Sequence, residues 1–112
     1  MIRASPFEIR SELEGDEARL TLSGELDLAT VPRAEEAVAS VLARGARRVV
    51  VDLSGLAFVD SSGLRMFITL HERTADEGWT LGLIRPAPPS LSVFEITGAE
   101  RNLPFIEDPR SP

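Results

Sequence analysis

Two adjacent serines, Ser61 and Ser62, lie where a buried strand is predicted to give way to a helix. They follow Asp60 and precede Gly63 and Leu64, so their hydroxyl groups fall in the first turn of that helix. A helix N-terminus carries unpaired backbone N–H groups and the positive end of the helix dipole. Such a terminus is capped by Asp60 or Ser61, or it receives an anion, and a phosphate group on Ser61 suits that field.

A hydrolytic role for Ser61 finds no support in the surrounding residues. The motif lacks the glycine that precedes the serine of a nucleophile elbow. The only histidine, His71, lies ten residues along the same helix, roughly 15 Å up its axis, which is too far for a general base. On the residues alone, Asp60, Ser61 and Ser62 are therefore either helix-capping groups or a site for phosphate.

His71 is interpreted as a packing residue. It falls in line with Leu64, Phe67, Ile68 and Ala75 at helical spacing, which predicts a partly buried imidazole with a satisfied hydrogen bond. A single histidine without any cysteine disfavours a transition-metal site, and no glycine-rich loop is present to cradle a nucleotide. We therefore expect no catalytic residue, no metal and no cofactor.

The composition is that of one folded domain with a net acidic charge. The chain has 112 residues, of which 43% are hydrophobic and 27% charged. We expect a single domain over 1–112, with its core from about 7 to 107 and flexible ends at 1–5 and 108–112. The net charge of −6 disfavours nucleic acid and anionic lipid as partners and favours a protein with a basic patch. Without a membrane span, a signal peptide or cysteine, a cytoplasmic location is expected.

The first half of the chain predicts a β-hairpin followed by a helix. Apolar and polar residues alternate over 7–13 and again over 18–24, with a turn between the two runs. Thr30 then precedes a valine and a proline, which predicts a helix from 31 to about 44 with Thr30 as its N-cap. The apolar stripe of this helix indicates that it packs against a sheet.

The second half alternates strands and helices, which is typical of βαβ units and predicts parallel strand pairing. With the hairpin, this gives an α/β fold: a mixed, mostly parallel β-sheet with an N-terminal antiparallel hairpin and crossover helices. The expected elements are a strand at 49–53, a loop at 54–59, a helix from 61 to about 77, a strand at 79–84, a helix at 90–97 and a strand at 103–106. The apolar side of the helix at 90–97 is expected to consist of Leu91, Phe94 and Ile96.

The order and spacing of several motifs resemble the STAS domain of the anti-sigma-factor antagonist type. The Asp-Ser-Ser-Gly motif is specific within that frame, although the tetrapeptide alone would mean little. The stretches that carry the resemblance are Gly24-Glu25-Leu26-Asp27, Val50-Val51-Asp52-Leu53-Ser54-Gly55-Leu56, Phe58-Val59-Asp60-Ser61-Ser62-Gly63-Leu64, and Ser90 to Gly98 followed by Leu103-Pro104-Phe105.

The resemblance implies a partner-switching regulator and not an enzyme. In that family the unphosphorylated antagonist binds an anti-sigma factor that is also a serine kinase, which frees the sigma factor. The kinase phosphorylates the first serine of the motif, here Ser61, and a metal-dependent serine phosphatase reverses the modification. Asp27 would lie in the kinase-binding surface, and Asp60 would help to present the acceptor. The implied partner-binding residues are Asp27, Asp60, Ser61, Ser62 and Gly63.

Two alternative functions stay open on the sequence. The first is a STAS subunit of another assembly, such as a stress-signalling complex or a lipid-transport system, in which Ser61 need not be phosphorylated. The second is a small-ligand or nucleotide-binding module, or a cryptic hydrolase. A neighbouring gene for a kinase or phosphatase would favour the partner switch, whereas a transporter operon would oppose it.

Overall fold

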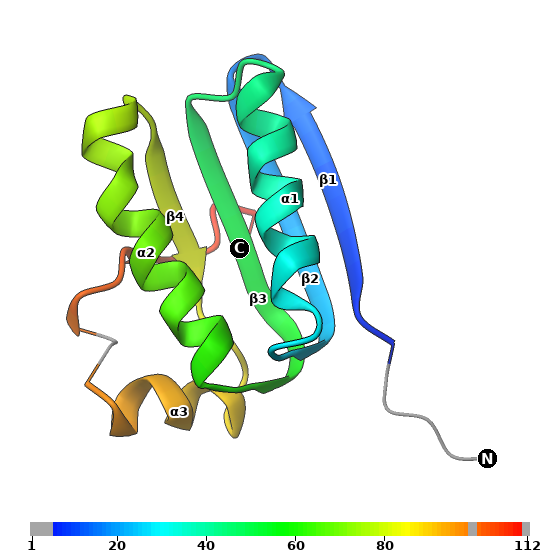
Figure 1. Ribbon diagram of the computed structural model, residues 1–112, viewed down its shortest axis with the longest axis vertical. Coiled ribbons are helices and arrows are strands. Elements are labelled where there is room, and N and C mark those ends of the chain that lie inside the picture. The colour runs from blue at the N-terminus through cyan, green and yellow to red at the C-terminus, as the bar shows by residue number, and fades with distance from the viewer. Residues whose placement is uncertain (1–5, 99–100, 111–112) are drawn as a thin grey trace.

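The computed structural model describes residues 6–98 and 101–110, which form a five-stranded sheet and three helices (Figure 1). The elements are β1 (Glu8–Glu14), β2 (Glu17–Leu26), α1 (Val31–Ala43), β3 (Arg48–Val59), α2 (Ser61–Glu77), β4 (Thr80–Ile84), α3 (Ser90–Ile96) and β5 (Phe105–Ile106). The strand order is β1-β2-β3-β4-β5, with β1 and β2 antiparallel and the other neighbours parallel. This arrangement confirms the predicted α/β fold with its leading hairpin.

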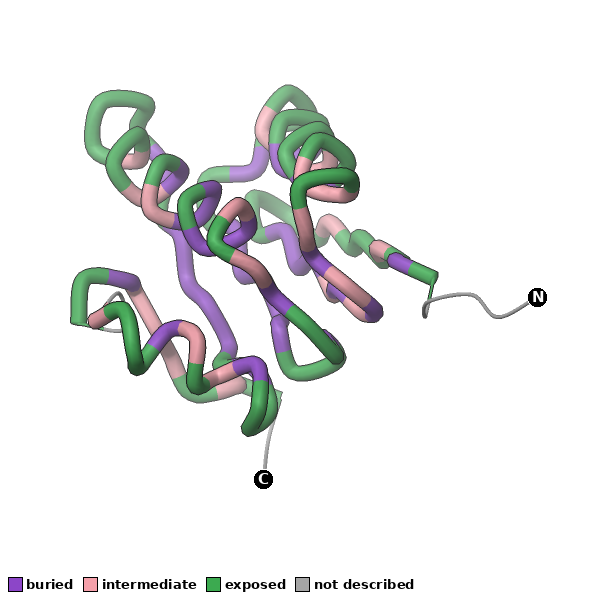
Figure 2. The backbone as a smooth tube through the Cα atoms, turned by 60° about the horizontal axis from the view of Figure 1, so that its bottom comes forward, coloured by how far each residue is buried: buried purple, intermediate pink, exposed green. Residues whose placement is uncertain are grey.

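The two long helices cover one face of the sheet. Each parallel strand pair requires a crossover, and α1 and α2 supply the crossovers from β2 to β3 and from β3 to β4. In Figure 1 they lie side by side over the strands, while α3 lies at the end of the sheet where α2 begins. Figure 2 shows the buried residues concentrated on the strands and on the helix sides that face them. The buried side chains that these strands and helices contribute to the hydrophobic core include Leu20, Leu22, Leu26, Val38, Val41, Val49, Val51, Leu53, Leu64, Phe67, Leu70 and Leu83.

A buried ion pair lies on the opposite face of the sheet. Arg19 alternates with residues of the core and is only 9% exposed. It donates a hydrogen bond to Asp52 at 2.8 Å and two to the carboxylate of Asp108 at 3.2 Å. The hydrogen bond from Arg19, followed by one from the backbone N–H of Arg110, holds the pKa of Asp108 below its usual value. The chain after β5 is thereby attached to the centre of the sheet.

Parts of the predicted flexible ends fall within this description. Residues 1–5 and 111–112 lie outside the described residues. Residues 108–110 carry the Asp108 contact and a second ion pair, between Arg110 and Glu12 at 3.2 Å. The flexibility of the ends stays a prediction. None of the helices in the described ranges combines the length and the apolar character needed to cross a bilayer.

The predicted loop at 54–59 is wrong, because these residues continue β3. Gly55 pairs with Ser23 of β2, and Val59 pairs with Leu26. The β2–β3 register shifts twice along the way, as it does at β-bulges, and the ladder then continues. Ser and Gly at 54–55 resemble a turn signal locally, but pairing with a strand distant in the sequence decides their conformation.

Three side chains on α2 and α3 are placed differently from the prediction. His71 is partly buried as expected, but its buried Nδ1 atom has no hydrogen-bond partner in the described part of the chain. Ala75, assigned to the same apolar stripe, is exposed. On α3, Phe94 is fully buried whereas Ile96 is 84% exposed, because this helix packs through one narrow side. The predicted end of α2 at about 77 is confirmed, since the helix ends at Glu77 and Gly78 follows it with a left-handed φ of 76°.

Candidate functional site

Asp60 caps α2 and leaves the hydroxyl of Ser61 available. The backbone N–H groups of Ser62 and Gly63 donate to Asp60 Oδ1 at 2.8 and 3.1 Å. Asp60 has extended backbone angles, as expected of an N-cap residue. Ser61 is the first residue of the helix and is exposed, and its side chain makes no hydrogen bond to any described residue. Of the two capping residues that the sequence left open, the structure therefore uses Asp60.

Asp27 holds the turn that leads from β2 into α1. The backbone N–H groups of Ala29 and Thr30 donate to Asp27 Oδ1 at 3.0 and 3.1 Å. Thr30 occupies the predicted N-cap position, but its side chain does not cap the helix. Its hydroxyl instead accepts from the N–H of Asp27 and donates to the carbonyl of Glu25, both at 2.9 Å. The predicted N-cap position is thus confirmed, while the hydroxyl is used by the strand end and is not available to the N–H groups of α1.

Asp27 and Asp60 lie side by side because β2 and β3 are adjacent parallel strands. Leu26 pairs with Val59, so the next residues, Asp27 and Asp60, leave the sheet at the same edge. The backbone N–H of Asp60 also donates to the Leu26 carbonyl at 3.1 Å, which fixes one strand end to the other. The structure thus brings together all five predicted partner-binding positions from two segments. Their role in binding stays a prediction.

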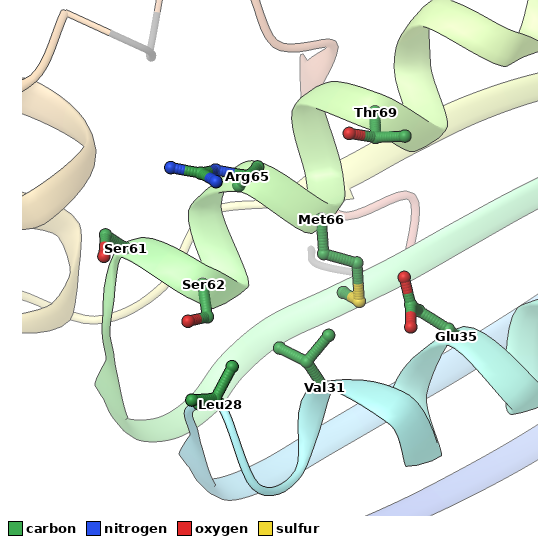
Figure 3. Close-up of a pocket in the computed structure, with 8 residues that line it drawn as sticks. All are labelled: Leu28, Val31, Glu35, Ser61, Ser62, Arg65, Met66 and Thr69. Carbon is green, nitrogen blue, oxygen red and sulfur yellow. The ribbon is translucent and has the colours of Figure 1, made fainter.

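A groove of about 310 Å³ runs beside Ser61 between the starts of α1 and α2 (Figure 3). Figure 3 shows Leu28 facing Ser62 and Val31 facing Met66 across it. Its charged groups are Glu35 from α1 and Arg65 from α2. The groove is lined by Leu28, Val31, Glu35, Ser61, Ser62, Arg65, Met66 and Thr69. Its apolar floor and its few polar groups are suited to receive a side chain of a partner.

Leu28 is the part of this site that the sequence reasoning missed. It is 76% exposed, whereas most large apolar side chains of the chain are buried. Phe58 is also 47% exposed and lies on β3 two residues before Asp60. Exposed apolar groups beside a polar motif are a frequent feature of binding surfaces. The signal available in the sequence was an apolar residue placed in a capping loop, directly after Asp27.

Gly63 is required by close packing beneath the site. A β-carbon at this position would lie 2.9 Å from Leu26 Cδ2 and 3.1 Å from Val59 Cγ1. Both neighbours are at most 1% exposed, so they have little room to move. The glycine therefore allows α2 to start directly against the ends of β2 and β3.

We expect Gly63→Ala to lower the free energy of unfolding by about 1 kcal/mol. Overpacking of this kind costs about 1–3 kcal/mol, and the better helix propensity of alanine returns up to about 1 kcal/mol. Urea unfolding followed by circular dichroism measures the difference. Ser62→Ala, in the same helical turn, adds no atom and is the matched control. A Gly63→Ala protein as stable as the wild type would contradict the packing argument.

The described residues provide no arrangement for metal chemistry, since they contain no group of three or more His, Cys, Asp or Glu side chains able to hold an ion. Asp27 and Asp60 each use one carboxylate oxygen to accept hydrogen bonds from backbone N–H groups, Asp27 in the turn before α1 and Asp60 at the start of α2. The geometry instead offers an exposed hydroxyl, two fixed carboxylates and an adjoining groove. These features are suited to recognition and to modification at Ser61.

Comparisons with known proteins agree with this arrangement. The family model described as "Mlab, STAS domain" matches residues 9–107. An anti-sigma-B factor antagonist of Staphylococcus aureus is 31% identical over 77 residues, which cover 69% of this chain and 71% of that protein. A crystal structure of an anti-sigma factor antagonist from Mycobacterium paratuberculosis superposes with a TM-score of 0.79 at 25% identity, covering 96% of this chain and 92% of that one.

A second similar structure is the Bacillus cell fate determinant SpoIIAA in its phosphorylated form. It has a TM-score of 0.68 at 18% identity and covers 94% of this chain and 93% of that one, so the likeness concerns the fold. The family match spans nearly all of the described chain, including Asp27, Asp60 and the serine motif. The protein therefore belongs to the STAS domain family, in which its relatives are anti-sigma factor antagonists.

Proposed function

We propose that this protein is an anti-sigma factor antagonist that binds an anti-sigma factor kinase around Ser61 and releases it when Ser61 is phosphorylated. The observation that carries the proposal is the exposed Ser61 hydroxyl, which Asp60 leaves unoccupied by capping the helix. The name of the Staphylococcus aureus relative supports the antagonist role. Such a partner places the protein in the cytoplasm, and its function is binding and not catalysis.

The modification is a phosphoryl transfer from ATP to Ser61. The Ser61 oxygen forms a bond to the γ-phosphorus, the bond from that phosphorus to the bridging oxygen breaks, and ADP leaves. The hydroxyl proton passes to a base of the kinase. A serine phosphatase returns the protein to its unphosphorylated state. It transfers the phosphoryl group to water, which releases inorganic phosphate. This chain contributes the position of the acceptor, held at the start of α2.

The charge of the phosphate explains why binding would be lost without refolding. Phosphorylation adds roughly −1.5 to −2 charges at neutral pH. Ser61 is exposed and takes no part in the cap, so the helix start tolerates the group. A partner covering this edge would have to desolvate the phosphate beside Asp60 and Asp27. A loss of about 3 kcal/mol in binding free energy weakens a complex more than 100-fold.

Incubation with the cognate kinase and ATP is expected to place one phosphate on Ser61. Peptide mass spectrometry locates it, and Ser61→Ala should remain unmodified while still binding the kinase. Ser62→Ala is the matched control, because Ser62 lies in the same turn but faces Leu28 across the groove (Figure 3). Modification of Ser62 alone, or kinase affinity that does not change once Ser61 carries phosphate, would contradict the proposal.

A second function, as a STAS subunit of a lipid-transport or stress-signalling assembly, stays open because the matching family model is described as "Mlab, STAS domain" and that description names no antagonist role. In that case the groove beside Ser61 would dock a subunit whose binding does not depend on phosphorylation. Binding that persists in the presence of ATP and kinase, together with a partner that is not an anti-sigma factor, would support this second function.

A further inference from the structure

Arg65 is placed one helical turn after Ser61 on α2. Residues four apart on a helix are neighbours, and an acidic group that precedes a cation by four residues has the favourable orientation. Both side chains are exposed, and both line the same groove. In Figure 3 the Arg65 side chain is directed toward the end of α2 that carries Ser61. The two groups are therefore within reach of each other.

Arg65 has no acidic partner in the described part of the chain. The same helix contains an arginine that does have one, since Arg73 binds Glu77 at 2.9 Å with a spacing of four residues. The groove contains one other charged group, Glu35, which makes no ion pair with Arg65. Arg65 therefore has the position of the basic residue in such an ion pair, but the residue four positions before it, Ser61, carries no negative charge.

The backbone donors of the three residues that follow Ser61 are already occupied. The N–H groups of Ser62 and Gly63 are bound to the carboxylate of Asp60, and the N–H of Leu64 donates to the Asp60 carbonyl at 3.2 Å. A phosphate on Ser61 would also lie close to the charge of Asp60. Arg65 is the one cation among the described residues that line this groove.

We propose, building on the proposed phosphorylation of Ser61, that Arg65 is the counter-charge that binds the phosphate within this chain. The guanidinium donates to the phosphate oxygens, as arginine does with phosphate groups elsewhere. The charges of Arg65 and Glu35, which line the groove, then no longer sum to zero, because the phosphate adds negative charge and the groove becomes more acidic. Phosphorylation would in this way alter both Ser61 and the adjoining surface that a partner covers.

The test uses the full chain with phosphoserine installed at position 61 by semisynthesis, so it needs no kinase. Phosphorus NMR then measures the second pKa of the phosphate, which is about 6 for phosphoserine. In Arg65→Gln we expect this pKa to rise by about half a unit, the size expected for an exposed ion pair. Arg65→Lys keeps the charge and should recover most of the wild-type value.

Arg73→Gln is the matched control, because it removes the same charge from the same helix. Arg73 lies twelve residues from Ser61, about 18 Å along the axis and beyond the screening length at 0.1 M salt. A shift in Arg65→Gln no larger than in Arg73→Gln would overturn the proposal, as would Arg65→Lys behaving like Arg65→Gln. If the kinase assay fails but the NMR shift appears, the pairing holds and the proposed phosphorylation by that kinase is what fails.

Discussion

Ser61→Glu is expected to weaken binding to the anti-sigma factor kinase by about 100-fold, a loss of about 3 kcal/mol, with the fold unchanged. The substitution places a carboxylate at the start of α2, next to Asp60 and beside the strand end that carries Asp27. A partner that buries this edge must desolvate the added charge, and no backbone donor of the Asp60 cap is left to compensate it. Ser61→Ala, which adds neither charge nor bulk, should bind as the wild type does.

Titration calorimetry with the purified kinase measures the three affinities, and circular dichroism checks that the variants are folded. Ser40→Glu provides the control for charge, because Ser40 is exposed on the later half of α1, away from the groove. We expect Ser40→Glu to change the affinity by less than threefold. Equal losses for Ser40→Glu and Ser61→Glu would point to general repulsion between the two proteins, and the site at Ser61 would then be wrong.

Local sequence signals were sufficient to predict the start of α2. A buried strand that ends in an aspartate, two serines and a glycine has the composition of a helix cap, and the hydrogen bonds that make this cap lie within three residues of each other. The hairpin was equally accessible, since β1 and β2 pair across a short turn with register Glu14 to Glu17. In both cases the determining contacts are close in the sequence.

The errors have the opposite cause, because their determining contacts are distant in the sequence. The segment 54–59 becomes strand through pairing with β2, more than 30 residues earlier. Thr30 is the exception, because it holds the N-cap position and its hydroxyl is used by Asp27 and Glu25, which lie only three and five residues earlier. The groove could not be predicted either, since it exists only where α1 and α2 lie side by side.

The tertiary contacts also give a physical reason for the glycine of the Gly24-Glu25-Leu26-Asp27 motif, and Gly24→Ala is expected to be strongly destabilising. Gly24 has a φ of 92°, a conformation that costs a residue with a side chain about 1–2 kcal/mol. A β-carbon there would also overlap the carbonyl oxygen of Pro6 and lie 2.9 Å from the Cα of Phe7. These are backbone atoms, so they cannot move aside as a flexible side chain would.

Adding about 1–3 kcal/mol for overpacking to the backbone strain, we expect Gly24→Ala to lose about 3 kcal/mol of stability and roughly 10 °C in Tm. Gly15→Ala separates the two causes, because Gly15 also has a positive φ, of 62°, but a β-carbon there would contact nothing within 4 Å. It should lose only the strain, about 1 kcal/mol. Thermal and urea unfolding measure both variants. If Gly24→Ala were no less stable than Gly15→Ala, contact with Pro6 and Phe7 would not be what requires glycine, and the motif would then need an explanation from partner binding.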